Sequence, residues 1–61
     1  MKMTEFTGYN GEPIYIDTDK IMSVARASDE MTVITMQAGT QGEDWNVKMP
    51  LREVLQRIQP T

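Results

Sequence analysis

Short stretches in which polar and apolar residues alternate run through most of the chain and predict β-strands. The strongest is residues 31–37, where β-branched side chains adjoin one another. We expect it to be the central strand, with Ile34 and Met36 facing the core and Val33 and Thr35 facing the other side. Four further strands are expected at residues 3–7, 12–17, 21–27 and 45–49. In the third of them, Met22 and Val24 suit one face, and Ile21, Ser23 and Ala25 the other.

Turn-forming residues separate these stretches. Asn10-Gly11 predicts a type I′ hairpin turn, because both residues tolerate a positive φ. Residues 17–20 predict a corner or a single helical turn in which short polar side chains hydrogen-bond the backbone. Residues 28–30 predict a tight reversal, and residues 38–44, with two glycines, predict a flexible polar loop.

The hydrophobic period changes from two to 3.6 after Pro50. Apolar residues then share one helical face: Leu51, Val54, Leu55 and Ile58. This stripe predicts a helix up to about Gln59, with Pro60 preventing its continuation. So short a helix is not stable alone, so its apolar face should pack on the sheet. The pattern therefore predicts an α+β fold, a five-stranded antiparallel β-meander curled into a half-barrel with one C-terminal α-helix on one face, in a single domain over residues 1–61.

Composition limits both the stability and the chemistry of such a domain. The chain has 61 residues and no cysteine or histidine. It therefore has no disulfide or thiolate metal site, and it lacks the usual general base. Six residues are Met, which specifies the shape of a core only weakly. Because a small core without a covalent or metal staple needs another source of stability, we expect a homo-oligomer, a dimer or higher.

The charge and hydropathy of the chain bear on its surroundings. Nine acidic residues against six basic ones give a net charge of −3, which disfavours non-specific binding to nucleic acid. No apolar run approaches the roughly 18 residues of a membrane span. Residues 1–5 lack the apolar segment of a signal peptide. We therefore expect a cytoplasmic protein that does not contact membranes.

Three acidic pairs are candidates for chemistry: Asp17/Asp19, Asp29/Glu30 and Glu43/Asp44. The first has the opening spacing of a calcium loop, but Lys20 and Ile21 follow in place of oxygen ligands, so we expect turn capping and no metal. The other two pairs are interpreted as solvated loop tips. Residues 39–42 lack the Lys-Ser/Thr of a phosphate-binding loop. We therefore predict no catalytic residue, no cofactor and no enzymatic activity.

The sheet face opposite the helix is the most informative surface, and its expected members are Tyr15, Ser23, Ala25, Val33, Thr35, Asn46 and Lys48. This face is either a surface for self-association or for a partner, with contacts from Tyr15, Ala25, Val33 and Thr35. The alternative is a half-polar face exposed to solvent, whose β-branched residues are present because they favour β-strands. Trp45 has the inward phase of a core residue. An exposed Trp45 would instead stack on a base or a partner side chain.

Several features follow one another along the chain: Asn10-Gly11-Glu12, Ile16 with Asp19 and Ile21, Thr32-Val33-Ile34-Thr35-Met36, Gly39, Val47, and Glu53-Val54 to Ile58. From about Phe6 onward, this order resembles the FlbD/SwrD family of small flagellar and swarming-motility proteins. The chain departs from the family in having Glu30-Met31-Thr32 where Pro-Asp-Thr is typical, in a longer loop between Gly39 and Trp45, and in Met49-Pro50 before the helix. The resemblance implies a fold and a motility-associated role, and it carries over no catalytic residue.

The helical segment is also similar to the C-terminal helix of CsrA-type RNA-binding regulators, but residues 3–6 lack that family's Arg-rich first strand. Two functions follow from these observations. The first is a non-enzymatic interaction module that self-associates and docks a protein partner. The second is a phage- or mobile-element-type inhibitor, acting as an acidic decoy or as an oligomer that sequesters a small nucleotide. In the second case Arg26, Lys48, Arg52 or Tyr15 would contact the anion at a subunit junction.

Overall fold

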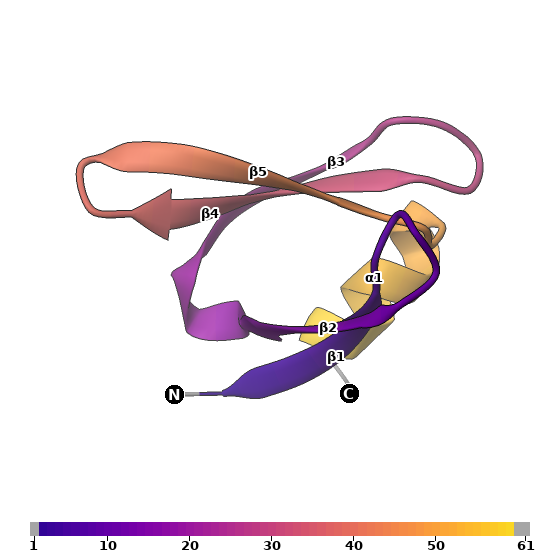
Figure 1. The fold of residues 1–61 in the computed structure, drawn as a ribbon, viewed down its shortest axis with the longest axis horizontal. Helices are drawn as coiled ribbons and strands as arrows, with labels where there is room; N and C mark the ends of the chain where they lie inside the picture. The colour runs from indigo at the N-terminus through magenta and orange to yellow at the C-terminus, as the bar shows by residue number, and fades with distance from the viewer. Residues whose placement is uncertain (1, 60–61) are drawn as a thin grey trace.

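The computed structural model describes residues 2–59, so Met1 and the predicted helix breaker Pro60 lie outside the described residues. Strands and one helix follow in the order β1 (Met3–Thr7), β2 (Pro13–Asp17), the 3-10 turn η1 (Thr18–Lys20), β3 (Ile21–Arg26), β4 (Thr32–Ala38), β5 (Gln41–Val47) and α1 (Leu51–Ile58). The predicted α+β class, with antiparallel strands before a C-terminal helix, is confirmed (Figure 1).

The strands form two sheets instead of the single curled meander that the sequence predicts. β1 pairs with β2, and a separate sheet has the order β3-β4-β5. β2 and β3 do not pair because η1 turns the chain between them, and the Asp17 carboxylate stabilises this turn by accepting from the Asp19 N–H at 3.0 Å. Two backbone interactions connect the two sheets. One is a β-bridge between Gly8 and Val47, and the other is the adjacent hydrogen bond from the Lys48 N–H to the Thr7 carbonyl at 2.8 Å.

Both sheets and the helix contribute to one small core, whose buried hydrophobic members are Phe6, Ile16, Ile34, Val47, Met49 and Val54. The predicted inward positions of Ile34, Val47 and Met49 are confirmed, and Met36 packs against this core. Thr32 is also fully buried, and its hydroxyl donates to the Met49 carbonyl at 2.7 Å.

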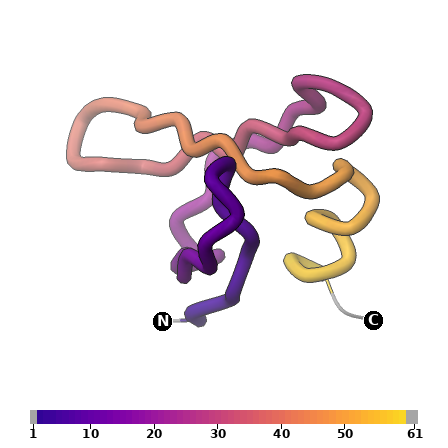
Figure 2. The backbone as a smooth tube through the Cα atoms, turned by 45° about the vertical axis from the view of Figure 1, so that its right-hand side comes forward, coloured from indigo at the N-terminus to yellow at the C-terminus, as the bar shows by residue number. Residues whose placement is uncertain are grey.

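The helix α1 lies beside the β1–β2 hairpin and below the three-stranded sheet (Figures 1 and 2), and it contacts β1 and β3. Val54 is fully buried and the Arg57 guanidinium donates to the Glu5 carbonyl of β1 at 2.7 Å. Leu55 is 45% exposed, so the expected packing of all four apolar side chains is wrong at this position. Successive helical residues point about 100° apart, and a helix that centres Val54 on the core therefore carries Leu55 to its margin.

The turn between β1 and β2 differs from the predicted type I′ turn. Its ends close through the Gly8 N–H, which donates to the Glu12 carbonyl at 2.7 Å, and Gly11 donates to the Gly8 carbonyl at 2.9 Å. Gly11 has a φ of +87°, while Asn10 keeps a negative φ. This is a type I turn followed by a left-handed glycine. The Asn10 side chain instead accepts from the Glu12 N–H at 3.1 Å.

The predicted polar loop at residues 38–44 is wrong, because most of it belongs to β5. Ala38 pairs with Gln41 across a turn made by Gly39 and Thr40 alone. Gly39 has a φ of +64° and Thr40 a negative one, as in a type II′ turn, whose twist matches that of the flanking strands. The β4–β5 hairpin therefore extends as an arm away from α1 and the β1–β2 hairpin (Figure 2).

A bulge in β3 explains the irregular pattern of that segment. Ile21 pairs with Met36 and Ser23 pairs with Thr35, so Met22 is the extra residue. The bulge changes the phase of the strand, and both Ile21 and Val24 pack against the core. The expectation that Met22 and Val24 share a face is wrong, since Met22 is 62% exposed.

Candidate functional site

Large hydrophobic side chains remain exposed over much of the described surface: Met3, Tyr9, Tyr15, Met22, Trp45 and Leu55. They equal in number the six hydrophobic residues that form the buried core. Single exposed apolar residues need no explanation, but apolar residues that line hollows mark binding surfaces. Leu55 lines one hollow, and Tyr9 and Trp45 line another.

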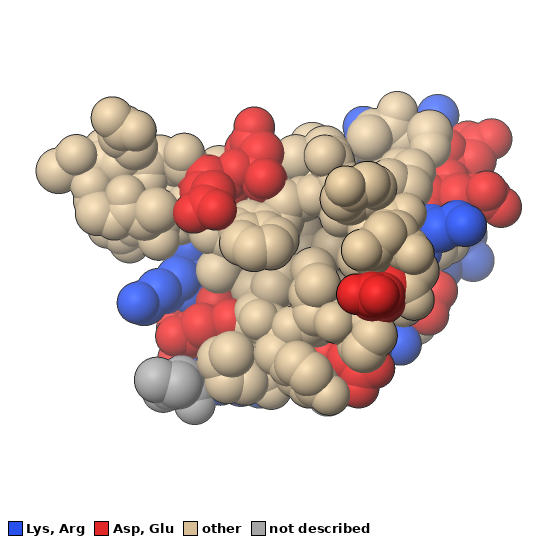
Figure 3. Space-filling model, viewed as in Figure 1, with Lys and Arg blue, Asp and Glu red and all other residues tan. Residues whose placement is uncertain are grey.

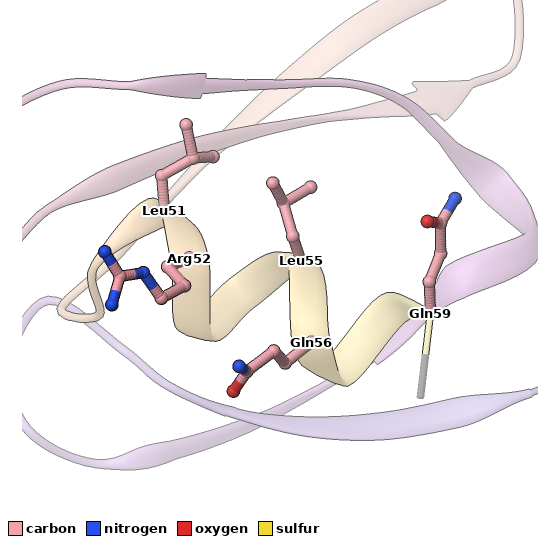
Figure 4. Close-up of a pocket in the computed structure, with 5 residues that line it drawn as sticks. All are labelled: Leu51, Arg52, Leu55, Gln56 and Gln59. Atoms are coloured by element: carbon pink, nitrogen blue, oxygen red, sulfur yellow. The ribbon is translucent and has the colours of Figure 1, made fainter. Parts of the chain in front are cut away.

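Two adjoining hollows along α1 share Leu51, Arg52 and Gln56. We call the combined surface the α1 groove; it is lined by Arg26, Asp29, Pro50, Leu51, Arg52, Glu53, Leu55, Gln56 and Gln59. In Figure 4, Leu51, Leu55 and Gln59 point from the same side of the helix, and Arg52 and Gln56 point from an adjacent side. The groove thus combines an apolar strip with charged flanks.

Two of the four residues predicted to contact an anion, Arg26 and Arg52, line this groove. Arg26 comes from the end of β3 and Arg52 from the first turn of α1. Arg26 also pairs with Asp29 at 3.4 Å, with both side chains largely exposed, so this ion pair contributes at most about 1 kcal/mol. Lys48 is exposed after the end of β5 and Tyr15 lies on β2, and neither residue lines the groove.

The predicted self-association residues are divided between the two sheets. Ala25, Val33 and Asn46 form one cross-strand row of the three-stranded sheet, while Thr35 lies in the next row. Tyr15 is exposed on β2 opposite Glu5, in the other sheet. The structure therefore brings together Ala25, Val33 and Thr35, and it leaves Tyr15 apart.

The Trp45 cleft lies where β1 and β5 separate. It has a volume of about 290 Å³ and is lined by Gly8, Tyr9, Asn10, Ile14, Asp44, Trp45 and Asn46. Trp45 is 41% exposed, so its predicted place in the core is wrong. It pairs with the buried Ile34, but beyond the Gly8–Val47 bridge the chain turns away from β5 and leaves the indole uncovered. No signal in residues 45–49 reveals this, because the turn that uncovers Trp45 is about 35 residues away in sequence.

Gly8 lines this cleft at the start of the β1–β2 turn. A Cβ at this position would lie 3.0 Å from the Glu12 carbonyl oxygen and 3.3 Å from a methyl group of Ile14. A side chain here would require these neighbours to move by a few tenths of an ångström, and glycine allows the backbone to approach closely without that movement. Tyr9, the next residue, also lines the cleft.

The acidic pairs occupy ordinary structural positions. Asp17 caps η1, which confirms the predicted turn-capping role. Across residues 2–59, no cluster of three or more acidic, His or Cys side chains is arranged to hold a metal ion. In the same residues, no helix has the length and apolar character needed to cross a membrane.

No family model, curated protein or solved structure matches the chain. The resemblance to the FlbD/SwrD family therefore stays an expectation from the sequence.

Proposed function

We propose that the chain is a non-enzymatic interaction module that self-associates through the α1 groove, in a motility-associated role that the FlbD/SwrD resemblance suggests. The observation that carries this proposal is the 45% exposure of Leu55 on a short helix whose neighbouring Val54 is fully buried. An exposed leucine beside the half-buried Leu51 gives an apolar strip that a partner can cover. We therefore propose α1 as the self-association surface instead of the predicted face with Ala25, Val33 and Thr35, where Val33 and Thr35 are already partly covered.

The charges around the strip favour a second copy of the chain as its occupant. Arg26 and Arg52 line the groove together with Asp29 and Glu53. In a twofold interface the same surface meets itself, so a surface carrying both signs can pair opposite charges across the axis. A surface of one sign would repel its copy. The small core supplies the reason for association, because burying Leu55 adds apolar contact that the isolated chain lacks.

The proposal predicts that Leu55→Glu weakens self-association while Met22→Glu, an equally drastic change at an exposed residue outside the groove, does not. We would record amide chemical shifts of the labelled protein over a range of concentrations. The shifts of residues 51–59 should move with concentration in the unmodified chain and in Met22→Glu, and stay constant in Leu55→Glu. Concentration-dependent shifts confined to β3 and β4 would refute the α1 groove as the interface.

A second candidate is the sequestration of a small anion such as a nucleotide, and the meeting of Arg26 and Arg52 favours it. Asp29 and Glu53 line the same groove and oppose an anion, so this function ranks second. It predicts that nucleoside phosphates raise the melting temperature and that Arg52→Gln abolishes the increase. Equal melting temperatures with and without nucleotide would exclude it.

A further inference from the structure

The outer edge of β5 is open to another strand. Among the described residues, the segment from Gln41 to Asn46 pairs with β4 alone, and its six residues are all exposed. At its end, the Lys48 N–H reaches across to the Thr7 carbonyl at 2.8 Å. Because backbone groups alternate between the two sides of an antiparallel strand, the groups of Gly42 and Asp44 point to the same outer side as those of Lys48. Among the described residues, no backbone bond outside the β4–β5 pairing is made by these groups, and the six-residue segment Gln41–Asn46 to which they belong is about 20 Å long.

The position of β1 shows where an added strand would lie. β1 runs beside the end of β5 as far as the Gly8–Val47 bridge, and the chain then leaves through the turn at Tyr9–Gly11. A peptide beside Gly42–Asn46 would take the place that β1 vacates. Its side chains on the inner face would reach the Trp45 cleft, in which Tyr9 and Trp45 are 71% and 41% exposed.

The charge of this edge determines what can bind there. Glu43 and Asp44 are the charged residues of β5, and no Lys or Arg lines the Trp45 cleft. Figure 3 shows acidic side chains gathered over β5, beside the uncharged tip of the hairpin. Glu43 lies on the same face as Trp45, two residues away, so one cationic side chain can meet both the carboxylate and the indole ring.

The same charges act against pairing with a second copy. Antiparallel pairing of β5 with its own twin would bring Glu43 and Asp44 close to the same carboxylates of the other chain, and like charges on paired strands are destabilising. β3, the other edge of this sheet, is protected differently, because its bulge at Met22 interrupts regular pairing. β5 lacks a bulge, a proline or a lysine, so its backbone edge is open to pairing. Its acidic side chains favour pairing with a cationic strand and disfavour pairing with a copy of the chain.

We propose that the free edge of β5 binds an extended peptide with Lys or Arg at alternate positions, adding it to the three-stranded sheet as a fourth strand. Backbone hydrogen bonds to Gly42 and Asp44 hold the peptide in register. Glu43 and the ring of Trp45 select the cationic side chains. The inference rests on the proposed role as an interaction module, but it uses a surface separate from the α1 groove.

The probe is an acetylated and amidated octapeptide that alternates Lys and Thr, titrated into the labelled full chain. Amide shifts of β5 and of Tyr9 should move, Trp45 fluorescence should change, and the affinity should fall with added salt. Two isomers of the peptide, N-methylated at every Lys or at every Thr, test the strand edge. One isomer should bind at least about tenfold more weakly than the other, because only one set of amides faces β5.

Glu43→Gln should weaken binding about two- to fivefold, the range expected for one cross-strand charge pair. Glu30→Gln makes the same change in net charge at the opposite end of β4 and should leave the affinity unchanged. Leu55→Glu should also bind normally, so that a failure of self-association and a failure of peptide binding are told apart. The proposal is overturned if the peptide does not bind, if both N-methylated isomers bind equally, or if the shifted amides lie on α1.

Discussion

Thr32 is the polar side chain that the described core buries completely. Its hydroxyl donates to the Met49 carbonyl at 2.7 Å and so connects β4 to the segment that leads into α1. Alternation from Ile34 places Thr32 on the inner face, but a sequence pattern does not show that a hydroxyl is needed there. The need arises from a carbonyl 17 residues away.

Thr32→Val keeps the shape of the side chain and removes the donor, leaving the Met49 carbonyl without this partner in the core. We expect the free energy of unfolding to fall by about 1–3 kcal/mol, measured by urea denaturation. The control is Thr35→Val, because the Thr35 hydroxyl donates to Asp44 at an exposed position and its loss should cost less than about 0.5 kcal/mol. Equal midpoints for Thr32→Val and the unmodified chain would contradict this role.

At the scale of elements, α1 shows what hydrophobic periodicity predicts about a helix and what it does not. The stripe of Leu51, Val54, Leu55 and Ile58 predicts a helix up to about Gln59, and α1 spans Leu51–Ile58. Periodicity marks an apolar face without saying how wide a strip the sheet covers. In the structure α1 contacts β1 and β3, and Leu55 remains outside the core.

Val54→Ala and Leu55→Ala should therefore differ, although both remove apolar atoms from the same predicted face. We expect Val54→Ala to lower the free energy of unfolding by about 2 kcal/mol, from lost burial and the remaining cavity. Leu55→Ala should cost less than about 1 kcal/mol in protein dilute enough to be monomeric. Thermal or urea unfolding of both variants at matched concentration measures the difference, and similar losses would mean that Leu55 is covered in the monomer.

The strands show a second limit of sequence patterns. Turn-forming residues predicted where the β1–β2 and β4–β5 reversals lie, but the type of each turn depends on the strand register. In the structure Gly11 is the left-handed residue that follows a type I turn, and Gly39 is the first residue of a two-residue turn. The bulge at Met22 follows from register as well. The polar composition of residues 41–44 concealed a strand, because an arm that extends beyond the core has no hydrophobic face to reveal it.

At the scale of the whole molecule, the surfaces depend on how two sheets and a helix meet. The α1 groove joins the end of β3 to the first turn of α1, and the Trp45 cleft joins the β1–β2 turn to β5. Each unites segments that are distant in sequence, so neither was predicted. Trp45 is nonetheless exposed, which is the condition under which we expected it to stack on a base or a partner side chain. Arg26 and Arg52 were two of the four residues expected at an anion site, with Lys48 and Tyr15, and the structure places these two at one groove.

The α1 groove and the β5 edge differ in the charges of their side chains. The α1 groove carries both signs and suits a second copy, whereas the β5 edge carries acidic residues and suits a cationic partner. A self-associated pair joined at α1 would leave two β5 edges open, and a partner with two basic segments would bind more tightly to the pair than to one chain. Self-association is thus the central claim of this account.

Sedimentation equilibrium of the unmodified chain over a wide concentration range tests that claim most directly. We predict a weight-average mass that rises from the 7.0 kDa of one chain toward twice that value, and that stays at 7.0 kDa for Leu55→Glu. A mass of 7.0 kDa at the highest soluble concentration of the unmodified chain, or an equal rise in Leu55→Glu, would contradict it.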